Sequence, residues 1–308
     1  MDKKSVDWKG PMPALVTPFD AKGGIDEAAY RRNVDICISN GMTGFVPNGC
    51  TGEFWAQTMT ERKRVMKICV DAAKGRAPVI PGCGAIRTED VIELASYAKE
   101  IGSAGVMILP PYFVKPSMDD VFAHYKAVSD AVKIPIMLYN IPANAGYALT
   151  PEMVSRLADL DTVVAIKESS GDFNNFYRTM ALAGDRIHVM LGPIALYGVA
   201  AFTMGSPGFV DTVPNFWAQG SLEMFESVKK GDMVRAMQLQ RIASEIRILL
   251  NANGRNMYCS TKAIMNMLGL PGGYVRPPLK PLGEPHLTEL RTAIERLGIG
   301  KVRSAAAE

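Results

Sequence analysis

The sequence predicts an α/β protein that closes into a (β/α)8 TIM barrel and ends in a C-terminal helical extension. Short apolar runs alternate with helical patterns eight times before residue 230, and such alternation is typical of a parallel sheet. Eight units in so short a chain favour a closed barrel over an open doubly wound sheet. No G-x-G-x-x-G follows the first apolar run, which argues against an open sheet that binds a dinucleotide. After Thr212 the pattern is purely helical.

The predicted strands are short apolar runs that end at turn signals, as expected for strands buried on both faces of a parallel sheet. In chain order they span residues 14–17, 44–47, 78–81, 105–109, 134–139, 163–167, 188–191 and 208–212. Lys167 ends the sixth run, where alternation along a strand would put Val163, Ala165 and Lys167 on one face.

The segments between the strands carry helix start and stop signals. These signals are Asp26 with Gly41, Thr88 with Gly102, the capping-box pair Ser117 and Asp120, and the N-cap Thr150 followed by Pro151. Later helical patterns cover residues 217–230, 233–251, 260–268 and 287–297. We therefore place the barrel in residues 1–230 and a helical extension packed on it in residues 231–308.

Composition and charge narrow the classes of function. Of the 308 residues, 48% are hydrophobic and 21% are charged, which suits a soluble globular protein with a sizeable core. The net charge of +3, without blocks of like charge, gives no support for a nucleic-acid or membrane partner. Residues 1–10 lack the apolar region of a signal peptide, and no apolar run reaches transmembrane length. Five scattered cysteines without a CxxC pair indicate a reduced, cytoplasmic setting.

Lys167 is the strongest candidate for a catalytic residue. Lysine is almost never buried unless it is paired or functional, yet this one ends an apolar run. Burial would lower its pKa and yield the neutral amine that Schiff-base chemistry needs. The alternative is an exposed lysine at a strand end that forms a salt bridge with Glu168.

Two further strand ends carry polar groups, and the active sites of such barrels lie at the C-terminal ends of the strands. The second strand leads into the turn 49–53, Gly-Cys-Thr-Gly-Glu, whose glycines allow a tight turn and whose N–H groups can bind a carboxylate. The fifth strand ends in Tyr139, a phenol that can relay protons. A plain strand-to-helix turn and a core tyrosine are the alternative interpretations.

Three segments together resemble the dihydrodipicolinate synthase / N-acetylneuraminate lyase family of class I, Schiff-base-forming lyases. They are Gly49-x-Thr51-Gly52-Glu53, Tyr139-Asn140-Ile141-Pro142 and Ile166-Lys167-Glu168, in family order and spacing. The resemblance implies a homotetramer built as a dimer of dimers, and a Schiff base between Lys167 and pyruvate or another small 2-oxo acid. It also implies that no metal or organic cofactor is needed, because the protonated imine serves as the electron sink.

The same resemblance assigns roles to the residues around the lysine. Tyr139 would carry protons between substrate and solvent, with Thr51 in the relay. The turn at Cys50 and Thr51 would bind the carboxylate of the 2-oxo acid. Gly192 and Val210 match positions whose carbonyl groups line the pocket near the lysine.

Three departures from the family pattern bear on specificity. Cys50 stands where the family usually has Thr or Ser, and a thiol is a poorer hydrogen-bond donor than a hydroxyl. Phe113 stands where the synthases have a tyrosine that reaches across the dimer interface, and it has no hydroxyl. Asn144 stands where the synthases have an arginine for the carboxylate of aspartate semialdehyde, and an amide cannot form a bidentate, charge-assisted pair.

These departures favour an aldolase or dehydratase of a 2-oxo-3-deoxy or hydroxy-2-oxo acid, with a neutral or hydroxylated acceptor end. Dihydrodipicolinate synthase, which condenses pyruvate with aspartate semialdehyde, is the first alternative. A catalytically silent barrel that binds metabolites is the second. Intact Lys167, Tyr139 and Thr51 count against the silent barrel, because folding alone does not require a lysine at the end of a buried strand.

Overall fold

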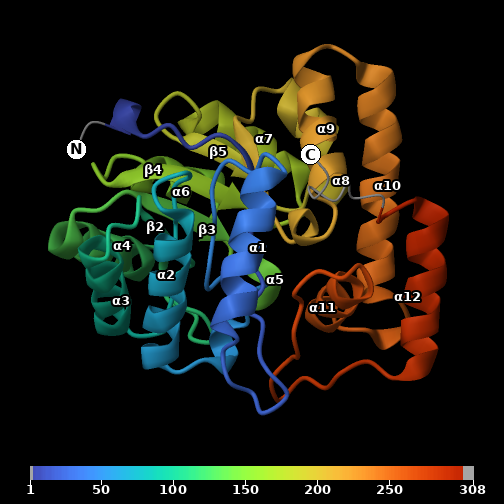
Figure 1. Ribbon diagram of the computed structural model, residues 1–308. Helices are drawn as coiled ribbons and strands as arrows, with labels where there is room; N and C mark the ends of the chain where they lie inside the picture. Colours follow the sequence, from blue (N-terminus) through green and yellow to red (C-terminus); the bar gives the residue numbers. More distant parts are fainter. Residues whose placement is uncertain (1–2, 301–308) are drawn as a thin grey trace.

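A computed structural model describes residues 3–300. Figure 1 shows a curled parallel sheet with helices around it and a group of C-terminal helices, α10 to α12, on one side. Within the described residues the strands are β1 (Gly10–Pro13), β2 (Val106–Ile108), β3 (Ile136–Asn140), β4 (Val163–Glu168), β5 (His188–Leu191) and β6 (Gly208–Asp211). They pair in parallel in the order β1-β6-β5-β4-β3-β2.

Isolated bridges close this sheet into a barrel. The segments 44–47 and 78–81 were predicted as regular strands, but they contribute only single parallel bridges. These bridges are Ala14–Val46, Phe45–Val79 and Gly82–Met107, and they connect β1 through both segments to β2. Pro47, Pro78 and Pro81 break the regular ladder because proline has no N–H to donate. Their carbonyl groups still accept hydrogen bonds from the neighbouring segments at 2.8–2.9 Å.

The first strand begins earlier than predicted, at Gly10 rather than at residue 14. Pro11 and Pro13 concealed it, since prolines inside a run argue against a strand. In the structure their carbonyl groups accept from the N–H groups of Thr43 and Val46, at 2.9 and 3.1 Å. The strand therefore pairs through acceptors where it has no donors.

Helices connect the strands and cover the outside of the sheet (Figure 1). The barrel helices are α1 (Glu27–Ser39), α2 (Met59–Ala73), α3 (Thr88–Glu100), α4 (Met118–Val132), α5 (Pro142–Ala145), α6 (Pro151–Leu157), α7 (Phe173–Ala183), α8 (Ile194–Thr203) and α9 (Ala218–Lys229). The extension contains α10 (Met233–Asn251), α11 (Met257–Met267) and α12 (Glu284–Leu297). Between residues 3 and 300, no helix is long and apolar enough to cross a membrane.

Most of the predicted helix caps are confirmed. Asp26, Ser117 and Thr150 each accept a hydrogen bond from a backbone N–H in the first turn of their helix. The prediction for Thr88 is wrong, because α3 begins at Thr88 itself. Its hydroxyl lies 2.9 Å from Nδ1 of His124 and bonds with that ring instead of capping the helix.

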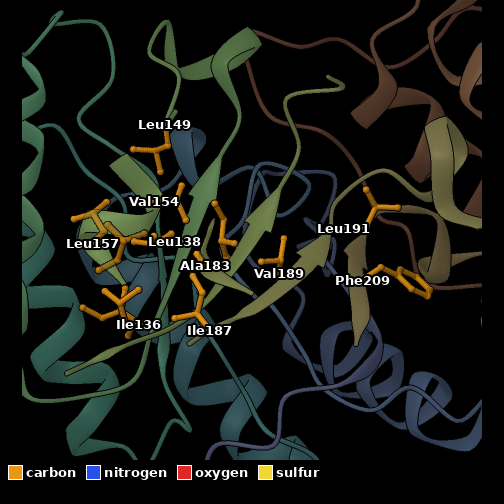
Figure 2. Close-up of a cluster of buried hydrophobic side chains, with 14 of the residues drawn as sticks. Ile136, Leu138, Leu149, Val154, Leu157, Ala183, Ile187, Val189, Leu191 and Phe209 are labelled. Carbon is orange, nitrogen blue, oxygen red and sulfur yellow. The ribbon is translucent and has the colours of Figure 1, made fainter. Parts of the chain in front are cut away.

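Apolar side chains pack on both faces of the sheet. Figure 2 shows part of the cluster between the sheet and the helices, with Ile136, Leu138, Leu157, Val189, Leu191 and Phe209 among its members. The barrel interior holds a second cluster, which includes Met12, Val46, Ile80, Met107, Met137, Ala165, Met190 and Val210. Alternation along the strands sorts the side chains into these two clusters.

One prediction about the strand faces is wrong. Val163 packs in the outer cluster, whereas Ala165 lies inside the barrel. Two consecutive residues of β3 pair with Val163 and Ala165, so Val164 between them is an extra residue. Such a bulge shifts the alternation by one position. Lys167 therefore shares its face with Ala165 but not with Val163.

Helix α10 joins the extension to the barrel. Its Ala236, Leu239 and Ala243 belong to the outer barrel cluster. Its Ile246 and Leu250 pack in a separate cluster with residues of α11 and α12. Because α10 contributes to both cores, it fixes where the extension lies against the barrel, while the exact boundary after residue 230 stays a prediction.

Candidate active site

A cavity of about 170 Å³ opens at the C-terminal ends of the strands. The residues predicted from the sequence all line it, namely Lys167, Tyr139, Thr51, Cys50, Asn144, Gly192 and Val210. The volume is below the about 300–1,000 Å³ that is usual for drug-sized ligands, so the cavity suits a small metabolite. Among residues 3–300, no group of three or more His, Cys, Asp and Glu side chains could hold a metal ion.

Lys167 reaches the cavity from the end of β4. Its side chain is almost fully buried, and Nζ lies 4.2 Å from the centroid of the Tyr139 ring. Burial lowers the pKa of Lys167 to about 8, although Cys50 and Asp211 act in the opposite direction. Desolvation thus outweighs the neighbouring charges, and part of the amine is neutral near neutral pH.

The salt bridge between Lys167 and Glu168 does not form. The Glu168 carboxylate accepts hydrogen bonds from Nδ2 of Asn140 at 2.7 Å, from Nδ2 of Asn175 at 3.0 Å and from the N–H of Ser170 at 2.7 Å. Successive strand residues face opposite sides of the sheet, so the two side chains diverge. Glu168 holds the ends of β3, β4 and α7 together, and within residues 3–300 Lys167 forms no ion pair with a carboxylate.

The turn 49–53 is held by its own backbone. The N–H of Gly52 donates to the carbonyl of Gly49, and the N–H of Glu53 donates to the carbonyl of Cys50, both at 3.0 Å. A Cβ on Gly52 would lie 3.1 Å from the carbonyl oxygen of Leu15, so the close approach of the two segments favours glycine. Among residues 3–300, the N–H of Thr51 donates to no protein acceptor. It is therefore available to an anion in the cavity.

Thr51 and Tyr139 each place a hydroxyl group against a different side chain of the site. Oγ1 of Thr51 lies 2.6 Å from Oγ1 of Thr212, and this contact is buried. The Tyr139 hydroxyl donates to Sγ of Cys50 at 3.9 Å. Burial raises the pKa of Tyr139 well above its ordinary value, so the phenol keeps its proton. In this geometry Cys50, rather than Thr51, is the side chain that Tyr139 contacts.

A buried ion pair fixes this turn from the C-terminal side. Glu53 has a left-handed backbone, with φ of 55°, and its carboxylate pairs with Lys262 of α11. Lys262 also donates to the carbonyl groups of Thr17 and Tyr274, at 2.8 and 2.7 Å. Removing either partner would leave an uncompensated buried charge. The pair therefore ties α11 to the turn that carries Cys50 and Thr51.

Sequence reasoning missed several polar residues of the cavity, and three of them carry an ionisable group. Asp211 ends β6, Arg247 comes from α10, and Tyr258 comes from α11. The Tyr258 hydroxyl interacts with the side chains of Asn144 and Cys50. Asp211 could have been found, because it lies at the end of the eighth apolar run. No local motif marks Arg247 or Tyr258, which reach the cavity only through the packing of the extension.

Phe113 lies outside this cavity. Its side chain is 89% exposed, and its backbone is left-handed, with φ of 72°. Within one chain it therefore contributes nothing to the site, and Tyr258 is the aromatic hydroxyl that stands beside Tyr139 and Cys50.

Comparisons with known proteins agree with this fold. A model of the dihydrodipicolinate synthetase family matches residues 7–297. The 4-hydroxy-tetrahydrodipicolinate synthase of Pelobacter propionicus is 35% identical over 292 residues, covering 95% of this chain and 99% of that protein. Its counterpart from Citrifermentans bemidjiense is 36% identical over 289 residues, covering 93% of this chain and 97% of that protein.

Solved structures show the same relationship. A prophage protein of the dihydrodipicolinic acid synthase family from E. coli K12, in complex with pyruvate, has a TM-score of 0.91 at 27% identity, covering 96% of this chain and 100% of that chain. The chloride-inhibited dihydrodipicolinate synthase from Acinetobacter baumannii, complexed with pyruvate, has a TM-score of 0.88 at 28% identity. The match covers 94% of this chain and 99% of that chain. The match spans nearly the whole chain, and this protein therefore belongs to the dihydrodipicolinate synthetase family.

Proposed function

We propose that this protein is a Schiff-base-forming lyase that acts on a small 2-oxo acid, with the amine of Lys167 as the nucleophile. The observation that carries this proposal is a buried lysine, with a pKa of about 8, in a small cavity at the C-terminal ends of the strands. Family membership supports it, and two relatives of solved structure bind pyruvate.

The chemistry follows from the neutral amine. Nζ of Lys167 adds to the C2 carbonyl of the acid, and the resulting carbinolamine loses water to give a protonated imine. The imine nitrogen accepts the electron pair when a proton leaves C3, or when the C3–C4 bond breaks and releases a carbonyl fragment. The enamine formed in either case can be reprotonated or can attack an electrophilic carbon. Hydrolysis of the final imine restores Lys167, so the cycle needs no metal or organic cofactor.

The surrounding residues have matching roles in this scheme. The protonated Tyr139 hydroxyl exchanges protons with the carbinolamine and with the oxygen on C4. The N–H of Thr51 and the thiol of Cys50 bind the C1 carboxylate. The carbonyl groups of Gly192 and Val210 line the pocket beside the imine. A Cβ at Gly192 would lie 1.8 Å from Oγ and 2.8 Å from Cβ of Ser169, so a side chain there would require Ser169 to move.

We propose an aldol cleavage or a dehydration of a 2-oxo-3-deoxy or hydroxy-2-oxo acid as the specific reaction. Asn144 in place of the synthase arginine supports this choice. The second candidate is the condensation of pyruvate with aspartate semialdehyde, which the names of the relatives from Pelobacter and Citrifermentans support. Turnover of aspartate semialdehyde in the presence of pyruvate separates the two candidates.

The assembly and the location of the protein also stay proposals. The family resemblance supports a homotetramer, and the exposed side chain of Phe113 is consistent with a contact to a second copy. Five free, buried cysteines support a reducing compartment such as the cytoplasm. Sedimentation of the purified protein measures its oligomeric state. Localisation of a tagged chain in cells shows its compartment.

Borohydride trapping tests the central proposal. The protein is incubated with pyruvate and borohydride, and the intact mass and the peptide map are then recorded. We expect one reduced pyruvyl group, located on Lys167, and none in Lys167→Arg, which keeps a positive charge without a nucleophilic amine. If no 2-oxo acid forms an adduct on Lys167, the lyase proposal fails and the silent metabolite-binding barrel becomes the better account.

A further inference from the structure

The cavity contains one cation that the proposed mechanism does not use. Arg247 lines the cavity from α10, and its side chain is exposed at the opening. Within the described part of the chain its guanidinium forms no ion pair, whereas Arg255 and Arg276 of the same extension are both held by glutamates. The charges of Lys167 and Arg247 both act on the Asp211 carboxyl, so this carboxyl lies within electrostatic range of both cations.

The packing of α10 fixes the position of Arg247. Nε2 of Gln240 donates to the carbonyl groups of Ile194 and Ala195, both at 3.0 Å, and Oγ of Ser244 donates to that of Ala195 at 2.7 Å. These contacts pin one face of α10 against the start of α8. Residues four and three apart share a helix face, so Gln240, Ser244 and Arg247 lie on this same face. A rigid helix, rather than a loop, therefore presents the guanidinium to the cavity.

Asp211 does not use up the donors of this guanidinium. Its two carboxylate oxygens accept from the backbone N–H groups of Ile194 at 2.9 Å and Thr212 at 2.6 Å. Arg247 acts on Asp211 only through its charge, without a hydrogen bond. The planar fork of the guanidinium is thus open to a ligand, and that fork matches a carboxylate better than a hydroxyl or a carbonyl.

Resting on the proposed Schiff-base function, we infer that Arg247 binds a carboxylate at the far end of the substrate, away from the imine. The substrate is then a 2-oxo diacid or, in the condensing direction, an acceptor that carries a carboxylate. This reverses the expectation of a neutral or hydroxylated acceptor end, which rested on Asn144 in the place of an arginine. The structure supplies the cation from α10 instead, and Asn144 interacts with Tyr258.

Two five-carbon acids test this inference. 2-Oxoglutarate and 2-oxopentanoate share the reacting carbonyl and the C1 carboxylate, and they differ only in the terminal carboxylate. The half-saturating concentration for adduct trapping on Lys167 is measured for each acid. The proteins compared are the unmodified protein, Arg247→Met, Arg247→Lys and the control Arg241→Met, which removes an exposed arginine of α10 that does not line the cavity.

We expect the unmodified protein to prefer 2-oxoglutarate by about 10- to 100-fold, the range of a charge-assisted hydrogen-bonded pair. Arg247→Met should bring this ratio close to one, Arg247→Lys should give an intermediate ratio, and Arg241→Met should keep the full ratio. Equal binding of the two acids by the unmodified protein, or a preference that survives in Arg247→Met, would overturn the inference.

Pyruvate separates this inference from the function on which it rests, because pyruvate has no far end. If neither pyruvate nor either five-carbon acid leaves an adduct on Lys167, the Schiff-base proposal fails. Calorimetric titration with 2-oxoglutarate and 2-oxopentanoate then decides the role of Arg247, because it needs no covalent step. The ratio of the two dissociation constants replaces the ratio of half-saturating concentrations.

Discussion

Schiff-base formation at Lys167 should follow a titration centred near pH 8, far below that of an ordinary lysine. Only the neutral amine adds to a carbonyl, so the rate of adduct formation follows the neutral fraction. Burial lowers the pKa of Lys167 from 10.5 to about 8. At pH 7 this change raises the neutral fraction from about 0.03% to about 9%, a gain of about 300-fold.

The pH profile has a shape that can be measured. With a pKa of about 8, the neutral fraction rises about 50-fold between pH 6 and pH 8 and only about twofold above that. Initial rates of trapping with pyruvate, followed by intact mass, give this profile directly. Lys167→Arg, measured in parallel, removes the background from other amines.

A different shape would refute the reasoning. If the rate keeps rising tenfold per pH unit up to pH 10, Lys167 has an ordinary pKa, and burial does not tune it. A profile that is flat from pH 6 upward would mean that a step other than attack by the amine limits the rate.

Two other outcomes follow from the same geometry. Tyr139→Phe should lower turnover by about 10²-fold or more, while pyruvate should still form an adduct on Lys167. The reason is that the phenol moves protons and the amine forms the bond. Equal turnover of the variant and the unmodified protein in a steady-state assay would reduce Tyr139 to a packing role. Lys167→Met should raise the free energy of unfolding at pH 7 by about 3 kcal/mol, since the folded state holds the ammonium form at a cost that corresponds to its lowered pKa. The folded state binds fewer protons than the unfolded state between about pH 8 and pH 10.5, so this gain should shrink as the pH rises through that window, and urea denaturation at pH 7 and pH 10 checks the sign.

The fold was predictable where the pattern is local and strong. Apolar runs with helical segments between them identified the barrel, and the runs that became β3 to β6 lie close to their predicted positions. The sequence could not show that residues 44–47 and 78–81 pair only through single bridges, because the loss of the ladder depends on which prolines face which neighbours. It also could not show the bulge at Val164, which depends on the register with β3.

The site was predictable to the same extent. Lys167, Tyr139 and the turn at Cys50 and Thr51 lie at strand ends, where barrel topology brings them together regardless of the details. Arg247 and Tyr258 depend on how α10 and α11 pack against the barrel, and the sequence around them reads as an ordinary helix. The prediction of a neutral acceptor end rested on the missing arginine near Asn144 alone, because the sequence does not show that Arg247 of α10 also lines the cavity.

The cavity is lined by residues of two kinds of element, the barrel strands and the helices α10 and α11 of the extension. Lys167, the proposed nucleophile, belongs to a strand whose neighbours are all packed, so few substitutions there can be tolerated. Arg247 and Tyr258 belong to helices whose opposite faces meet solvent or the separate core of the extension. If the proposed Schiff-base function holds, a descendant of this chain could therefore change its substrate through two helices while it keeps the strand that carries Lys167. Transplanting α10 and α11 between relatives is accordingly a direct route to new specificities on the same barrel.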